Sequence, residues 1–298
     1  MDTDTDTGRR PSGSAARRSP APIAVTGATG QLGGRIARRL ASAGIEQRLL
    51  VRDVSRAPQL PGAEAARAPY GEGDAVRQAL TGVPIVLMVS GSEAADRVEQ
   101  HRTFIDAASD AGVEHLVYIS FSGAAPDATF TLARDHWATE EHIRARDLPA
   151  TFLRDNLYLD ILPDLVGPDG AIRGPAGDGR VAAVARDDIA DAAVAVLRDP
   201  GAHDGQAYEL TGPEALSLAD AAARLSAIAG RAVTYVEESL DEAYASRASY
   251  GAPDWQLDAW VSTYLAIADG SLSTVTTAIP DLTGHPARTL EQALRPHP

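Results

Sequence analysis

Two amino acids are missing from this chain, cysteine and lysine. Without cysteine there are no disulfides, no thiolate nucleophile and no cysteine-bound metal. Without lysine, no ammonium group can act as a general acid, form a Schiff base or bind phosphate. The many alanines suggest a GC-rich genome, in which codon bias accounts for the missing lysine.

Long hydrophobic runs and an excess of positive charge are also missing. No apolar stretch approaches the roughly 20 residues that cross a bilayer, and the N-terminus has no apolar core of a signal peptide. The 27 basic and 41 acidic residues give a net charge of -14, which argues against nucleic acid as a partner, since phosphate contacts need basic surface. We expect a cytoplasmic protein with a small-molecule substrate and no membrane partner, and a homodimer is left open.

The order of the patterns predicts an α/β protein. Residues 1–20 have almost no apolar side chains and predict a disordered tail. Residues 21–154 alternate apolar runs with helical stretches, which is typical of a Rossmann-type, doubly wound parallel sheet covered by helices on both faces. The expected strands are Pro22 to Thr26, Gln47 to Arg52, Ala63 to Arg67, Pro84 to Val89, His115 to Ser120 and Ala150 to Arg154. The expected helices are Gln31 to Ala43, Asp74 to Leu80, Glu93 to Ala111 and Ala133 to Arg146.

Residues 155–298 predict a smaller, mainly helical C-terminal lobe that binds the substrate. A segment at about 181–212 is expected to return to the Rossmann sheet, and the substrate crevice should lie between the two parts, beyond the carboxyl ends of the strands. The expected elements are a loop from Gly167 to Arg180, helices Asp187 to Arg198, Leu218 to Ala229, Leu240 to Ala248 and Asp254 to Ala268, and a strand Gln206 to Leu210.

The segment IAVTGATGQLGG places three glycines between an apolar run and a helical pattern. Gly27 supplies a tight turn, Gly30 lets a pyrophosphate approach the backbone, and Gly33 lets the helix pack against the strand. The unpaired amides of the helix N-terminus then face the phosphates. The pattern favours a dinucleotide site over a purely structural turn. The residues predicted to contact the dinucleotide here are Thr26, Gly27, Thr29, Gly30, Gln31, Leu32 and Gly33.

The end of the second strand indicates which dinucleotide is bound. Enzymes that prefer NAD carry an acidic residue there, which accepts hydrogen bonds from the ribose. This strand ends with Arg52, followed by Asp53. A guanidinium at that place pairs with the 2′-phosphate of NADP, and Arg35 in the first helix is placed to help. We therefore predict NADP(H), with an NAD enzyme in which Asp53 holds the ribose as the alternative.

Polar residues follow other strands at the same edge of the sheet. Ser90, Gly91 and Ser92 follow the fourth strand, where the chain commonly passes the nicotinamide ribose, although Ser-Gly-Ser is also an ordinary loop. Tyr70 follows the third strand and Tyr158 the sixth, so each is either a pocket wall or a proton donor. We predict that Tyr70, Ser90, Gly91 and Ser92 contact the cofactor.

The usual catalytic pair of this fold is missing. Most short-chain dehydrogenases have Ser or Thr after the fifth strand and Tyr-x-x-x-Lys in the next helix, where the lysine lowers the pKa of the tyrosine. Here Ser120 is present, but His136 lies near the tyrosine position and Glu140 near the lysine position. Histidine can donate a proton near neutral pH. We predict His136, Ser120 and Tyr158 as catalytic residues; alternatively His136 is a surface residue with Glu140 as its i,i+4 partner, and His101 either faces the crevice or packs.

Several blocks between about Ile23 and Leu294 occur in a fixed order. They are TGATGQLGG, Val51-Arg52, Tyr70-Gly71, SEAADRVEQHRTFIDAASDAGV, Asp135-His136, LRDNLY, AGDGRVAAVARDDIA and YELTG. Together they resemble the NmrA-like, atypical short-chain dehydrogenases, and most of all the type-2 NAD(P)H:quinone oxidoreductases. The resemblance implies an NADPH-binding Rossmann domain, no flavin, no metal and hydride transfer to a quinone-like acceptor. The family tends to have Asn-Gly or Pro-Gly after the Leu-Arg of LRDNLY, where this chain has Asp155-Asn156, so the loop beside the nicotinamide is expected to differ.

Three functions are compatible with these patterns. The leading hypothesis is an NADPH-dependent reductase of a quinone or related carbonyl or enone compound, working without the Tyr-Lys pair. The second is a non-catalytic regulator that senses NADP(H), as the NmrA proteins do, which the missing tyrosine and lysine favour. The third is a tailoring enzyme of secondary metabolism on the same fold.

Overall fold

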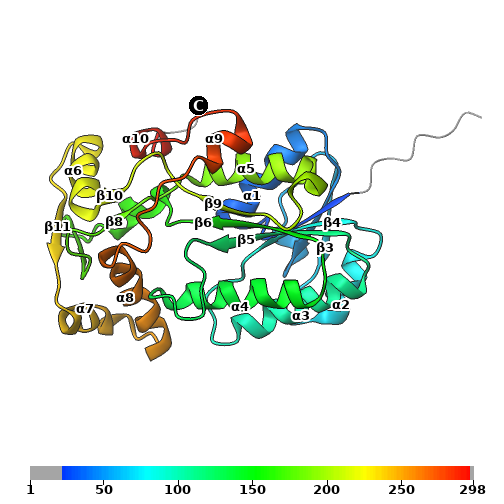
Figure 1. Ribbon diagram of the computed structural model, residues 1–298, viewed down its shortest axis with the longest axis horizontal. Coiled ribbons are helices and arrows are strands. Elements are labelled where there is room, and N and C mark those ends of the chain that lie inside the picture. The colour runs from blue at the N-terminus through cyan, green and yellow to red at the C-terminus, as the bar shows by residue number, and fades with distance from the viewer. Residues whose placement is uncertain (1–21, 296–298) are drawn as a thin grey trace, which may run out of the picture.

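The strands of the main sheet are all parallel, and helices cover both faces (Figure 1). The computed structural model describes residues 22–295, so the tail predicted over residues 1–20 lies outside the described residues. In spatial order the seven strands are β3 (Ala63–Arg67), β2 (Gln47–Val51), β1 (Ile23–Thr26), β4 (Ile85–Val89), β5 (His115–Phe121), β6 (Ala150–Asp155) and β9 (Ala207–Leu210). The expected α/β, doubly wound parallel sheet is confirmed.

The helices form one layer on each face of the sheet. On one face lie α1 (Gln31–Ser42), α5 (Arg186–Arg198) and the short α9 (Ala278–Thr283). On the other lie α2 (Gly73–Leu80), α3 (Arg97–Asp110) and α4 (Thr131–Ala145). Three short 3-10 turns connect elements at η1 (Val54–Arg56), η3 (Pro200–His203) and η4 (Ala248–Tyr250).

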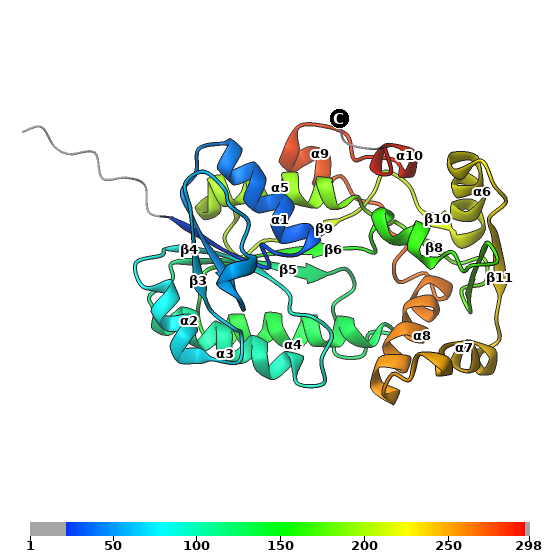
Figure 2. The same cartoon turned by 180° about the vertical axis from the view of Figure 1, so that it is seen from behind.

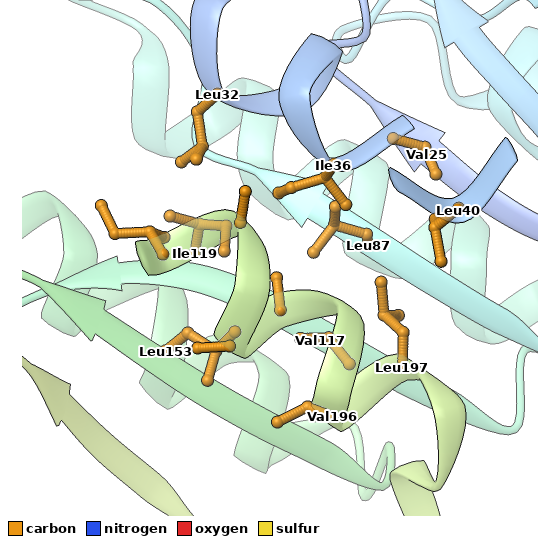
Figure 3. Packing of buried hydrophobic residues seen from close by; sticks show 14 of the residues in the cluster. Val25, Leu32, Ile36, Leu40, Leu87, Val117, Ile119, Leu153, Val196 and Leu197 are labelled. Carbon is orange, nitrogen blue, oxygen red and sulfur yellow. The ribbon is translucent and has the colours of Figure 1, made fainter. Parts of the chain in front are cut away.

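A continuous apolar core joins α1 and α5 to the sheet (Figure 3). Leu32, Ile36 and Leu40 recur every four residues on α1 and are buried, so one face of the helix covers the strands. Val196 and Leu197 of α5 meet the same strands. This packing fixes the N-terminus of α1 at the carboxyl end of β1.

The C-terminal lobe lies beyond the carboxyl ends of β5 and β6, whose arrows point toward it in Figures 1 and 2. Its elements are η2 (Leu159–Leu165), β7 (Ala171–Gly174), β8 (Arg180–Val181), β10 (Leu216–Ser217), α6 (Leu218–Ala229), β11 (Thr234–Glu237), α7 (Leu240–Arg247), α8 (Asp254–Ala268) and α10 (Leu290–Ala293). Its hydrophobic core also takes in Phe121 and Phe130, from the connection between β5 and α4. The division of the chain into domains stays a prediction.

The structure corrects two of the expected elements. The segment Gly167 to Arg180, expected to be a loop, contains β7, which pairs in parallel with β11. A side chain at Gly174 would place its Cβ 2.2 Å from Cδ1 of Tyr264, so this glycine allows close packing rather than a turn. The helix expected from Glu93 begins only at Arg97, which leaves a loop after β4.

The segment at about 181–212, which was expected to return to the Rossmann sheet, is divided between the C-terminal lobe and the main sheet with its helices. β8 pairs antiparallel with β10 in the lobe, whereas α5 packs on α1 and β9 extends the main sheet beside β6. Across residues 22–295, no helix has the length and apolar character that crossing a membrane requires.

Candidate functional site

The glycine segment forms a cradle at the carboxyl end of β1. Gly27 has φ +65°, and its carbonyl accepts a hydrogen bond from the Gly30 amide at 2.8 Å. A Cβ at Gly33 would lie 2.4 Å from the Gly27 oxygen, so no side chain fits there. Gly30 caps α1 without a side-chain hydrogen bond, and the first turn has no acidic residue. The N-terminal amides of α1 are therefore open to an anion, which fits a dinucleotide pyrophosphate.

The end of β2 presents an unpaired cation. Arg52 is exposed and makes no hydrogen bond or ion pair with residues 22–295. The Asp53 carboxylate instead accepts from the Ser55 amide at 2.9 Å and the Ser55 hydroxyl at 2.7 Å, and these bonds lower the pKa of Asp53. Asp53 thus caps η1, and the exposed Arg56 at the end of that turn adds a second positive charge that the sequence patterns did not indicate.

Arg35 lies away from this cation. Its guanidinium is 3.5 Å from the Asp160 carboxylate and 3.4 Å from the Asp187 carboxylate, and it donates to the Gln31 side chain at 2.9 Å. These partners bind Arg35 to η2 and α5, so its predicted part in holding a 2′-phosphate is not favoured. The phosphate-binding prediction therefore depends on Arg52.

Tyr70 joins the carboxyl ends of β1 and β4. Its hydroxyl oxygen lies 2.6 Å from Oγ1 of Thr26 and 2.5 Å from the Val89 carbonyl oxygen. Thr26 Oγ1 also accepts from the Val89 amide at 2.8 Å. Burial raises the pKa of the Tyr70 phenol, which therefore stays protonated. These contacts favour a wall of the site over a proton donor.

His101 holds the loop that follows β4. The Gly91 amide donates to Nε2 of His101 at 2.8 Å, so Nδ1 carries the ring hydrogen and donates to Oγ1 of Thr139 at 2.9 Å. Burial lowers the pKa of His101 to about 3, which keeps the ring neutral. Of the two alternatives for His101, packing is correct, and it fixes the loop of Ser90, Gly91 and Ser92 against α4.

His136 is buried rather than on the helix surface. Nη2 of Arg97 lies 2.8 Å from its Nε2, and since a guanidinium only donates, Nδ1 carries the hydrogen and donates to the Tyr118 hydroxyl at 2.9 Å. Burial lowers the pKa of His136 well below its ordinary value. The alternative interpretation, a surface pair with Glu140, is wrong, because this interior site gives both ring nitrogens other partners.

Glu140 is fully buried and receives hydrogen bonds from two arginines and one serine. Arg154 donates from Nε at 2.8 Å and from Nη2 at 2.7 Å, Arg144 donates at 2.9 Å, and the Ser120 hydroxyl donates at 2.6 Å. Burial by itself would raise the pKa of Glu140, but the donors outweigh it and lower that pKa. The Ser120 hydroxyl, predicted to be catalytic, is committed to this carboxylate.

Tyr158 lies just past the end of β6 and is half-buried. Its hydroxyl oxygen lies 2.7 Å from Oδ2 of the buried Asp155, within hydrogen-bond distance. The Arg186 guanidinium lies over the Tyr158 ring, 4.7 Å from the centroid. Of the three predicted catalytic residues, His136 and Ser120 are buried, whereas Tyr158 is half-buried and has the titratable Asp155 as its partner.

The lobe meets the loop after β4 through α8. The Glu93 carboxylate accepts from Nε2 of Gln256 at 3.0 Å and from Nε1 of Trp260 at 3.3 Å. These two hydrogen bonds join the loop after β4 to α8 of the lobe.

The sequence profile of the NmrA-like family matches residues 20–247, which is most of the chain. This chain belongs to the NmrA-like family. The match covers the glycine cradle, the Arg52 strand end, the buried histidines and the LRDNLY segment.

Relatives of this NmrA-like chain include named reductases. An NAD(P)H azoreductase of Xenophilus azovorans is 34% identical over 280 residues, which cover 92% of this chain and 97% of that protein. The structure of an NADPH-dependent quinone oxidoreductase of Escherichia coli, complexed with NADPH, is 34% identical with a TM-score of 0.83, covering 91% of this chain and 98% of that one. A Citrobacter triphenylmethane reductase complexed with NADP(H) is 31% identical with a TM-score of 0.81, covering the same shares.

Two residues of the NmrA-like site had no clear signal in the sequence. Arg97 is 4% exposed, and its Nε has no partner within residues 22–295. The burial of Arg97 depends on where α3 starts, and the sequence pattern placed that start at Glu93 instead of Arg97. Asp155 stood out only as a departure from the family pattern, and its burial beside Tyr158 depends on the packing of α5.

Proposed function

We propose that this protein is an NADPH-dependent reductase that passes a hydride to a quinone or a related carbonyl or enone compound. Relatives 34% identical over most of the chain are named oxidoreductases, which supports an NAD(P)H-dependent oxidoreductase. The observation that carries the proposal is the glycine cradle. The space around Gly33 admits no side chain, and the open amides of α1 suit a pyrophosphate.

The choice of NADPH over NADH is supported by charge. Arg52 has no partner within residues 22–295, Arg56 lies four residues further on, and Asp53 is occupied by Ser55. Two guanidinium groups suit a 2′-phosphate, whereas Oδ1 of Asp53 is engaged by Ser55 in capping η1.

The residues of the chain would share the chemistry as follows. Bound NADPH would supply the hydride. Tyr158 would donate the proton that the reduced acceptor oxygen needs, because the residue follows the carboxyl end of β6 and is only half-buried. His136 and Ser120 would have a structural role in the site. His136 is hydrogen-bonded to Arg97 and Tyr118, and Ser120 is hydrogen-bonded to Glu140.

Arg97 would supply positive charge where the usual lysine is absent. It is buried at the start of α3, its Nε has no partner within residues 22–295, and its charge lowers the pKa of Tyr158, Asp155 and Tyr118 against the larger effect of burial. A cation there favours negative charge on a reduced acceptor.

The test is NADPH oxidation with a panel of quinones, enones, azo compounds and triphenylmethane dyes, the last two because relatives are named for them. We expect turnover with at least one quinone or enone, and Tyr158→Phe should lower kcat by about 10²-fold or more while leaving NADPH binding intact. Background rates with the whole panel would overturn the proposal.

A regulator that senses NADP(H) is the second candidate. The observation in its favour is that His136 and Ser120, two of the three predicted catalytic residues, use their polar atoms in internal hydrogen bonds. Tight NADPH binding together with no turnover of any acceptor would support the regulator.

A further inference from the structure

Asp155 is a carboxyl group buried at the active edge of the sheet. It is the last residue of β6, lies opposite Phe121 of β5 and Leu210 of β9, and is 2% exposed. Its side chain lies on the same face of the strand as Leu153, which belongs to the core under α1 and α5. A carboxyl in this place needs a reason, because burying a charge costs free energy.

The hydrogen bond to Tyr158 gives the carboxyl a place in the reaction. We propose that Asp155 is a carboxylic acid at neutral pH and resupplies the proton that Tyr158 donates to the reduced acceptor. The inference rests on the proposed reductase function and adds a residue to it. Tyr158, partly exposed, would face the acceptor, and Asp155 would lie behind it, with its Oδ2 2.7 Å from the phenol oxygen.

The protonation state of Asp155 decides what Tyr158 can do. A phenol has one hydrogen, so an ionised Asp155 accepts that hydrogen and holds it away from the acceptor. A protonated Asp155 instead donates to the phenol oxygen, which frees the phenol hydrogen for the acceptor. The acid form is therefore the active form, and ionisation switches the donor off.

The surroundings favour the acid form. Burial raises the pKa of Asp155 to about 8, while the Tyr158 hydroxyl and the positive charges of Arg186 and Arg97 lower it by less. These are the titratable and charged groups that face Asp155 from its own loop, from α5 and from α3. Burial, followed by the Asp155 charge, raises the pKa of Tyr158 well above its ordinary value. The chain has no lysine to lower that pKa, and a neighbouring acid can return a proton to the phenol oxygen.

The step balances in atoms and electrons. The acceptor gains a hydride from NADPH as a new C–H bond, and the electron pair of its C=O π bond moves to oxygen. The Tyr158 O–H bond breaks as the new acceptor O–H bond forms, and the Asp155 O–H bond breaks as the Tyr158 O–H bond is restored. Asp155 is left as a carboxylate, which takes one proton from water before the next turnover.

The first experiment compares pH profiles of kcat for the wild type and Asp155→Asn. We expect the wild-type rate to fall about tenfold per pH unit above the pKa of about 8. The amide of Asp155→Asn donates to Tyr158 at every pH, so its rate should stay flat there. Asp160→Asn, in the same segment, should keep the wild-type profile. A wild type without the alkaline fall, or a variant that keeps it, overturns the inference.

The second experiment needs neither cofactor nor acceptor. The carboxyl carbons of ¹³C-labelled aspartate are followed by NMR during a pH titration of the wild-type protein. One carboxyl should titrate at about pH 8 and be missing from Asp155→Asn. If no acceptor is reduced but this carboxyl titrates as expected, the reductase proposal fails and the protonated Asp155 stands. If turnover occurs but no aspartate titrates above neutral pH, the role of Asp155 fails alone.

Discussion

Nη2 of Arg97 donates a hydrogen bond to Nε2 of His136 over 2.8 Å, inside the layer between α3 and α4. The two side chains are 4% and 6% exposed. The guanidinium fixes the tautomer of the ring and, after burial, is the next cause of the low pKa of His136. A neutral histidine with two fixed hydrogen bonds is a structural support more than a proton donor.

Replacing His136 with glutamine tests this role. Glutamine keeps an acceptor for Arg97 and a donor for Tyr118, so His136→Gln should lower kcat less than tenfold. The unfolded chain protonates histidine below about pH 6.5 whereas the folded protein does not, so wild-type stability falls as pH drops through that value. His136→Gln should lose less stability than the wild type as pH falls through about 6.5, and calorimetry at a series of pH values measures the difference. A kcat loss of orders of magnitude with unchanged stability would support the catalytic role predicted from the sequence.

The Glu140 carboxylate should be one of the most sensitive positions for stability. In Glu140→Gln an amide faces Arg154 in place of a charge, which should cost about 3 kcal/mol or more because the arginine loses its buried counter-charge. The pKa of Glu140 is lowered by folding, so the loss is full above about pH 4.5 and shrinks as pH falls below it. Thermal unfolding measures it. Glu141→Gln, exposed and paired with Arg144, should change stability by less than about 1 kcal/mol.

Cofactor preference should depend on Arg52. Arg52→Ser should weaken NADPH binding by about 10- to 100-fold, the range expected for loss of charge-assisted hydrogen bonds to a phosphate. NADH lacks the phosphate, so its affinity should hardly change. Titration calorimetry with both cofactors gives the comparison, and Arg77→Ser, an exposed arginine paired with Asp74 on α2, is the matched control. Equal losses for NADPH and NADH contradict the assignment of Arg52.

Two glycine-to-alanine changes separate the cradle from an ordinary turn. Gly33→Ala brings Cβ to 2.4 Å from the Gly27 oxygen, so α1 must move and cofactor binding should be lost. Gly44→Ala also strains the backbone, at φ +71°, but has nothing within 4 Å, so it should cost about 1–2 kcal/mol and leave binding unchanged. Binding titrations and thermal unfolding of both variants decide the matter; normal NADPH binding by Gly33→Ala is the contradicting result.

The strands and helices around β1 and α1 were predictable because their apolar residues repeat with the period of the element. Leu32, Ile36 and Leu40 show this at helical spacing, and α6 and α8 were placed at their observed bounds. β7 and β11 were not predicted, although β1 and β9, which are also four residues long, were. Their pairing depends on tertiary contacts such as the close approach of Gly174 to Tyr264.

The site was predictable in outline and not in its hydrogen bonds. The position of the cradle follows from glycine spacing, which is local. The partners of His136, Glu140 and Arg97 come from different helices and strands, so no spacing in the sequence reveals them. The sequence pattern therefore identified His136 as chemically notable but did not reveal its partners, Arg97 and Tyr118.

The core of the C-terminal lobe has a consequence for synthesis of the chain. Phe121 and Phe130, whose ring centroids lie 4.9 Å apart, belong to that core, yet they precede the rest of the lobe in the chain. While the ribosome makes the later residues, these two rings have no apolar cover from α6 or α8. A nascent chain halted before α6 should thus expose this aromatic pair, and transiently exposed apolar surface of this kind is prone to aggregation.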